Sequence, residues 1–166
     1  MIKFFRVISI ILTLAIMILI FSMSSQVAKV SNKTSGGLIE KVLNVVYPNF
    51  ENLQTEEKEN IISNFQYVVR KTAHFSIYFA LGICVLMSII TYCNLRLYVR
   101  IVLSGIICII YAASDELHQL YVAGRSCELF DVFIDAIGSI LGILIGYFLY
   151  RLMLIYIRKK RRENNA

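Results

Sequence analysis

Four stretches of the chain are long and apolar enough to cross a lipid bilayer. A membrane-spanning helix needs ~20 mainly apolar residues, and the hydrophobic pattern predicts four such helices, at about residues 4–23, 72–93, 97–118 and 131–152. The first apolar run is longer than that of a signal peptide, and no small-residue cleavage site follows it, so we interpret it as a retained span. The pattern therefore predicts an all-α fold, a four-helix transmembrane bundle.

The long connection between the first two spans has a pattern of its own. Apolar residues repeat there at helical spacing in two short segments, separated by Pro48. The members of the two repeats are Leu38, Ile39, Val42, Leu43 and Val46, and then Ile61, Ile62, Phe65, Val68 and Val69. We expect two amphipathic helices in this loop, the second running directly into the second span.

The composition agrees with a membrane protein. The 166 residues are 58% hydrophobic and 17% charged, whereas a soluble domain is ~25% charged. This length suits one domain, and we expect a single membrane domain over residues 1–166. Four cysteines without a C-x-x-C spacing do not form the pattern of a disulfide framework or of a zinc–cysteine site.

The basic residues indicate an orientation. With four spans, three basic groups lie on one side of the membrane: Lys3 with Arg6, Arg96 with Arg100, and the stretch 151–162. Lysine and arginine collect on the cytoplasmic side, so we expect both termini in the cytoplasm and the loops 24–71 and 119–130 outside. The terminal cluster directly follows an apolar helix, which favours this topological role over nucleic-acid binding, and no nucleic-acid partner is expected.

Polar residues share helix faces with small residues. At 100° per residue, Asp131 and Asp135 fall on one stripe with Gly138, Gly142 and Gly146. Small residues on one face allow close helix packing in a membrane. The same holds in the third span, where Ser104, Cys108 and Ala112 lie within one sector around Asp115. These carboxylates should therefore face neighbouring helices, since an ionised group on a lipid-facing surface is costly.

The polar groups lie near the outer ends of their helices, and we expect them to converge in one outward-facing, partly buried cavity. The residues assigned to it are Ser25, Gln26, Arg70, Lys71, His74, Asp115, Glu116, His118, Gln119, Arg125, Asp131 and Asp135. Either its cations only pair with its carboxylates, because buried charges are normally paired, or they bind a ligand.

Five short motifs resemble the VanZ-like family of membrane proteins. They occur in order as F-S-M-S-S-Q, R-K-T-A-H-F, D-E-L-H-Q, G-R and D-V-F-I-D-A-I-G, between Phe21 and Gly138. The resemblance implies a four-span protein of the bacterial cytoplasmic membrane. It also implies an association with reduced sensitivity to teicoplanin and related lipoglycopeptides.

Two functional hypotheses fit these residues. In the first, Arg70, Lys71 and Arg125 bind a cell-envelope component, either a lipid-linked cell-wall precursor or a lipoglycopeptide, since arginine suits phosphate and carboxylate groups. The alternative is an intramembrane hydrolase or transferase, with or without a metal, acting on a lipid-linked envelope substrate. Its candidate catalytic residues are Glu116, His118, Asp115 and His74. D-E-L-H-Q lacks the H-E-x-x-H spacing, so we assign no metal site, and the sequence assigns no cofactor. Transport is less favoured, because four short spans leave little room and no inverted repeat is visible.

Overall fold

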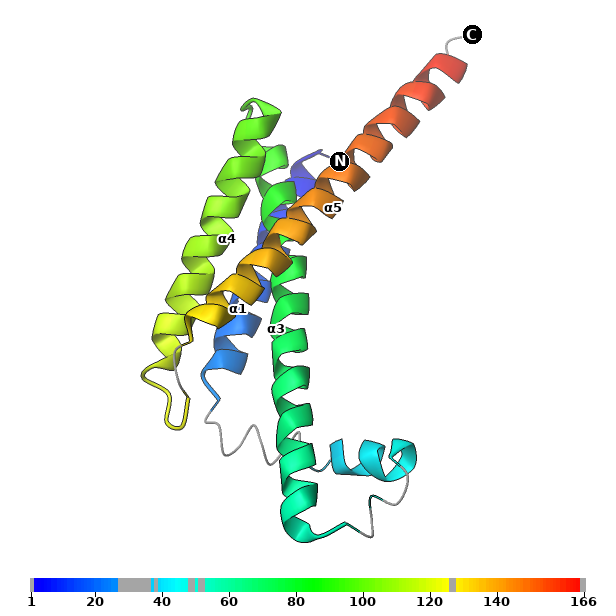
Figure 1. The fold of residues 1–166 in the computed structure, drawn as a ribbon. Helices are drawn as coiled ribbons and strands as arrows, with labels where there is room; N and C mark the ends of the chain where they lie inside the picture. The colour runs from blue at the N-terminus through cyan, green and yellow to red at the C-terminus, as the bar shows by residue number, and fades with distance from the viewer. Residues whose placement is uncertain are drawn as a thin grey trace.

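The computed structural model describes residues 2–26, 37, 39–47, 50, 53–125 and 128–164. Four long helices dominate it: α1 (Ile2–Ser24), α3 (Thr55–Tyr92), α4 (Leu97–Gln119) and α5 (Leu129–Glu163) (Figure 1). Within these ranges there is no β-strand, and each long helix has the length and apolar composition needed to cross a membrane. The prediction of an all-α protein with four apolar spans is confirmed.

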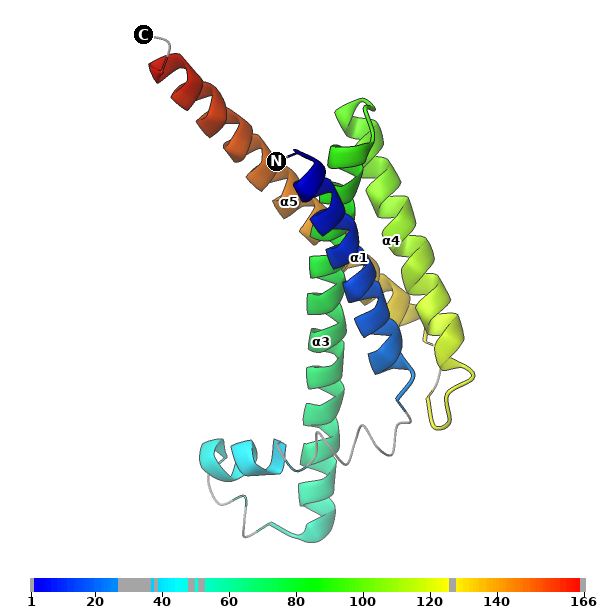
Figure 2. The same cartoon turned by 180° about the vertical axis from the view of Figure 1, so that it is seen from behind.

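The helix ends separate into two groups. Both termini and the α3–α4 connection lie at one end of the bundle, and the end of α1 and the α4–α5 connection lie at the other, as both views show (Figures 1 and 2). The three basic groups of the sequence therefore share one end. The polar residues assigned to the cavity gather at the opposite end, which we call the polar end.

The helix α3 is longer than one span. Its 38 residues reach roughly 57 Å, so its first turns extend past the polar end of the other helices (Figure 1). A second, short helix at residues 39–46 packs beside these turns. Its contact is an apolar cluster of Ile39, Leu43 and Phe50 with Leu53, Ile61 and Ile62. Both helices expected in the loop are present, although Leu38 of the first lies outside the described residues, and the second is continuous with the long apolar helix.

The glycines of α5 set its contact with α3. A Cβ atom at Gly138 would lie 2.6 Å from the carbonyl oxygen of Phe75, and one at Gly142 would overlap the carbonyl of Phe79. Glycine at these positions therefore lets the two backbones touch. Because the two helices run in the same direction, the contact continues toward the polar end to His74, which directly precedes Phe75, and to Asp135, one turn before Gly138.

The bundle core begins directly behind the polar end. Tyr78, Leu81 and Ile143 are buried there together with Cys108 and Ala112 of α4. Ser104, on the same stripe of α4, is also buried. The stripe of small residues predicted around Asp115 thus faces the bundle, and it draws α4 close enough for Asp115 to meet α1 and α5.

Candidate functional site

A polar cavity of about 60 Å³ opens at the polar end between α3, α5 and the α4–α5 connection. This space is several times the ~10–15 Å³ that one water needs. Its lining residues are Arg70, Lys71, His74, Gln119, Gly124, Arg125, Glu128, Asp131, Ile134 and Asp135. Seven of the twelve residues assigned from the sequence line it.

One wall of the cavity is built by residues of α3 that face the start of α5. Lys71 Nζ contacts Asp131 Oδ1, and it lies 3.4 Å from Glu128 Oε2. One turn further, His74 Nδ1 is 3.6 Å from Asp135 Oδ2. The glycine contacts one turn beyond fix this register, because they hold the two helix axes together.

The ends of α1 and α4 meet beside this wall. Ser24 Oγ donates to Asp115 Oδ2 at 2.7 Å, and both residues are buried. Ser25 Oγ lies 3.1 Å from His118 Nε2, and the His118 ring stacks on Phe21 with 4.5 Å between ring centroids. These contacts lie behind the cavity, so Ser25, Asp115 and His118 support the site without lining it.

Glu116 holds the connection between α4 and α5. Its side chain is only 2% exposed, and Glu116 Oε1 accepts a hydrogen bond from the backbone N–H of Glu128 at 2.9 Å. Glu128 is the N-cap residue of α5. A buried carboxylate that accepts a backbone N–H stabilises the point where α5 begins, which is the element that carries Asp131 and Asp135.

Arg125 ties the same connection to α1. Gly124, at φ 79°, adopts the left-handed conformation that glycine favours and turns the chain so that Arg125 reaches inward. The guanidinium donates to the carbonyls of Gln26 and Met23 at 3.0 and 3.1 Å, and to Gln119 Oε1 at 3.2 Å. The α1 helix has no basic residue in its last turn, so Arg125 supplies the donors and the positive charge that its C-terminal carbonyls favour.

The acceptors of Arg125 are neutral, so none of these bonds compensates its charge. Burial and the neighbouring Arg70 guanidinium lower the pKa of Arg125, while Asp115 and Glu116 act in the opposite direction. Arg70 also lines the cavity, and it forms no hydrogen bond or ion pair with any residue that the structure describes. Within the described part of the chain, the cavity thus has two guanidinium groups near one another that no carboxylate binds.

This arrangement bears on the two alternatives left open by the sequence, one of which was that the cations only pair with the carboxylates. Lys71 does so, but the two arginines do not. The Gln26 side chain is exposed, and only its backbone carbonyl takes part. The residues at this end that the sequence-based set left out include Ser24, Tyr78 and Glu128. The position of Ser24 at the end of the first span was the only signal for its contact with Asp115.

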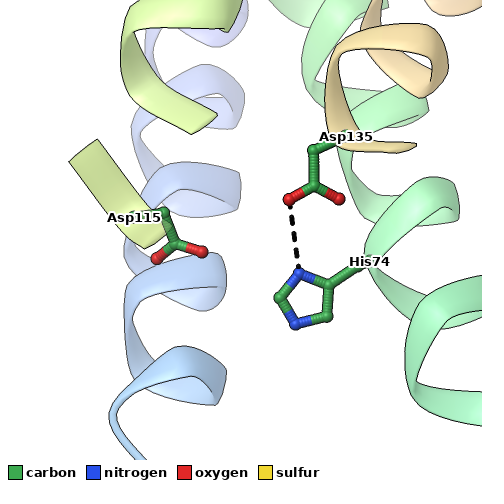
Figure 3. Close-up of side chains that lie close together, drawn as sticks. All are labelled: His74, Asp115 and Asp135. Carbon is green, nitrogen blue, oxygen red and sulfur yellow. Dashed lines mark ion pairs between the residues drawn. The ribbon is translucent and has the colours of Figure 1, made fainter. Parts of the chain in front are cut away.

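Three of the assigned residues could together hold a metal ion. His74 of α3, Asp115 of α4 and Asp135 of α5 each have a ligand atom, and these atoms lie within 4.8 Å of one another. Their side chains point into a common gap between the helices (Figure 3). The two carboxylates are 4% and 2% exposed.

Comparison with known proteins places the chain in one family. The VanZ/LLP1 family model matches residues 9–153, a range that contains all of α3 and α4 and most of α1 and α5. No curated protein and no solved structure matched the chain. Because the match extends over most of the chain and includes every residue of the cavity, the protein belongs to the VanZ/LLP1 family.

Proposed function

We propose that this membrane protein binds the anionic head group of a cell-envelope component in its polar cavity, at the outer face of the bacterial cytoplasmic membrane. The observation that carries the proposal is the pair Arg70 and Arg125, two guanidinium groups at one cavity that form no ion pair with a carboxylate of the described residues. Like charges near one another in a partly buried site disfavour each other, and an anion bound by both guanidinium groups would relieve this repulsion.

The chemistry of the pair suits phosphate and carboxylate. Guanidinium groups present planar, fork-shaped donors that bind both anions in two-point contacts. The cavity of about 60 Å³ has room for a phosphate or carboxylate group and is too small for a lipid chain, so the apolar part of the ligand would stay in the bilayer. A lipid-linked cell-wall precursor combines an anionic group with an apolar chain, and so does a lipoglycopeptide.

The orientation follows from charge. Arg6, Arg96, Arg151 and the segment 158–162 belong to the end of the bundle that carries both termini (Figure 1). Assigning this end to the cytoplasm obeys the positive-inside rule. The cavity then opens to the outside, where wall precursors and lipoglycopeptides are encountered.

The proposal is tested by expressing the protein in a glycopeptide-sensitive Gram-positive host. Wild-type protein should reduce sensitivity to lipidated teicoplanin more than to vancomycin, which lacks a lipid chain. Arg70→Gln should abolish this protection while the protein still accumulates in the membrane. The matched control is Arg151→Gln, which removes an arginine at the opposite end. Full protection by Arg70→Gln, or none by wild type, would contradict the proposal.

An enzymatic role is the second candidate. His74 and Asp135 line the same cavity as the arginines, so a bound head group would lie beside groups able to transfer a proton. A hydrolase or transferase acting on the lipid-linked ligand is consistent with this arrangement. Release of phosphate or of a truncated head group by purified protein would favour it over binding alone.

A further inference from the structure

We propose that His74, Asp115 and Asp135 form a binding site for one divalent transition-metal ion, such as Zn²⁺ or Mn²⁺. The sequence assigns no metal site, because the three residues are far apart along the chain and match no ligand spacing. This inference is independent of the head-group proposal, since it rests on other side chains and is tested by metal binding alone.

The distances suit ligands of a shared ion. His74 Nδ1 and Asp135 Oδ2 are 3.6 Å apart, which is too long for a good hydrogen bond. Two ligands bound at ~2.0–2.1 Å in a tetrahedral site lie roughly 3.4 Å from each other. The widest separation among the three ligand atoms is 4.8 Å, so rotation of one carboxylate completes the site.

The unpaired oxygens are the second observation. Asp115 Oδ1 and Asp135 Oδ1 are both buried without a hydrogen-bond partner among the described residues. Nearly all buried polar atoms in proteins have a partner, and two ionised carboxylates near one another in a low-dielectric region repel. An ion of charge +2 would neutralise both carboxylates while His74 binds as a neutral imidazole.

The surroundings resemble the outer shell of a metal site. Ser24 donates to Asp115 Oδ2, leaving Asp115 Oδ1 free to bind, and hydrogen bonds of this kind orient ligating carboxylates. The Tyr78 ring stacks on His74 at 6.5 Å between centroids. Its hydroxyl is buried without a partner among the described residues, so it could donate to a water or an oxygen ligand of the ion.

The ligand set and the cavity define the class of ion. One imidazole nitrogen with two carboxylate oxygens suits borderline transition metals better than Mg²⁺ or Ca²⁺, which favour all-oxygen sites. Three protein ligands leave a coordination position open, as in catalytic zinc sites. His74 and Asp135 both line the cavity. The ion would therefore enter through the cavity, and the open coordination position would face it.

The test is metal binding by the full-length protein purified in nanodiscs. After treatment with a chelator, the protein is titrated with Zn²⁺ or Mn²⁺, and bound metal is measured by mass spectrometry after gel filtration. We expect one equivalent per chain. We also expect a higher unfolding temperature with metal, because the ion binds the folded state. His74→Ala and Asp135→Asn should weaken binding roughly 100-fold or more, since loss of an outer-shell partner alone costs 10–100-fold.

The matched control is His118→Ala, because the chain has only two histidines and His118 contacts Ser25 and Phe21 instead of the cluster. This variant should bind metal as the wild type does. Binding of Co²⁺ gives a second readout, since its visible absorption reports the ligands of the ion: the spectrum should change in His74→Ala and in Asp135→Asn and stay as in the wild type in His118→Ala. Two results would overturn the proposal: wild-type protein that binds no metal, or His74→Ala and Asp135→Asn variants that bind metal as tightly as the wild type. Binding of Mg²⁺ alone would overturn the transition-metal assignment.

Discussion

Ser24 Oγ donates a hydrogen bond to Asp115 Oδ2 at 2.7 Å, and both residues are buried. The bond joins the end of α1 to the end of α4 at the polar end of the bundle. It is the one hydrogen bond that the structure gives to the Asp115 carboxylate from another helix, since Asp115 Oδ1 has no partner among the described residues. The Ser24 hydroxyl therefore stabilises the buried Asp115 carboxylate and holds it in position.

Replacing Ser24 by alanine should destabilise the protein. The change leaves both oxygens of Asp115 without a donor, and an unsatisfied buried polar group costs about 1–3 kcal/mol, more when it is charged. The measurement is reversible unfolding in detergent. Ser25→Ala is the matched control, because the Ser25 side chain is only partly buried and bonds chiefly to its own helix. Equal losses in the two variants would show that the Ser24–Asp115 bond has no special role.

The glycine contact between α3 and α5 predicts a difference between two similar substitutions. Gly142→Ala would push a methyl group into the Phe79 carbonyl, and overpacking of this kind costs about 1–3 kcal/mol. Gly105→Ala meets nothing within 4 Å, and alanine is the better helix former by about 1 kcal/mol. Thermal unfolding should thus show a loss for Gly142→Ala and no loss for Gly105→Ala. Tolerance of both would mean that α3 and α5 are not in backbone contact.

The ion pair of Lys71 with Asp131 should have a measurable coupling energy. The two side chains are 12% and 21% exposed, so solvent screens them only in part. A double-mutant cycle of Lys71→Met and Asp131→Asn should give about 1–3 kcal/mol. The comparison pair, Lys159 and Glu163, is 3.9 Å apart and 77% and 64% exposed, and it should give about 0.3–0.5 kcal/mol. Similar values for both pairs would argue against a shielded polar end.

The proposed orientation is tested with single cysteines. The four native cysteines, of which Cys127 lies outside the described residues, are first replaced by alanine. Tyr121, 88% exposed in the α4–α5 connection, and Lys159, 77% exposed near the C-terminus, are then changed to cysteine one at a time. In intact cells an impermeant maleimide should label Tyr121→Cys at once and Lys159→Cys only after permeabilisation. The reverse pattern would invert the topology and place the cavity in the cytoplasm.

The sequence predicts the helix faces well, because each face is a local property. The stripe of Gly138 and Gly142 indicates a close helix contact, and the structure confirms it against Phe75 and Phe79. The stripe around Asp115 likewise faces the core. Periodicity determines the inward side of each helix, and the cost of charge in lipid requires the carboxylates to be on it.

The sequence does not determine which residues meet across the bundle. Angular position on a helix says nothing about the shift of one helix along another, so the grouping of His74 with Asp115 and Asp135 could not be derived. One of the two alternatives left open by the sequence was that the cations, Arg125 among them, only pair with carboxylates. The structure directs it to the carbonyls at the end of α1 instead, because the left-handed turn at Gly124 sets the path of the chain.

The most direct test of the central claim is binding of a polyprenyl phosphate to the protein in nanodiscs, measured by titration against the neutral polyprenol. Arg70 makes no bond that the fold requires among the described residues, so Arg70→Gln should fold normally and isolate its role in binding. We predict that the phosphate binds, that the polyprenol does not, and that Arg70→Gln weakens binding about tenfold or more, as expected for loss of a charge-assisted contact, while Arg151→Gln has no effect. Equal binding of both lipids, or unchanged affinity in Arg70→Gln, would contradict an anion site at the polar end.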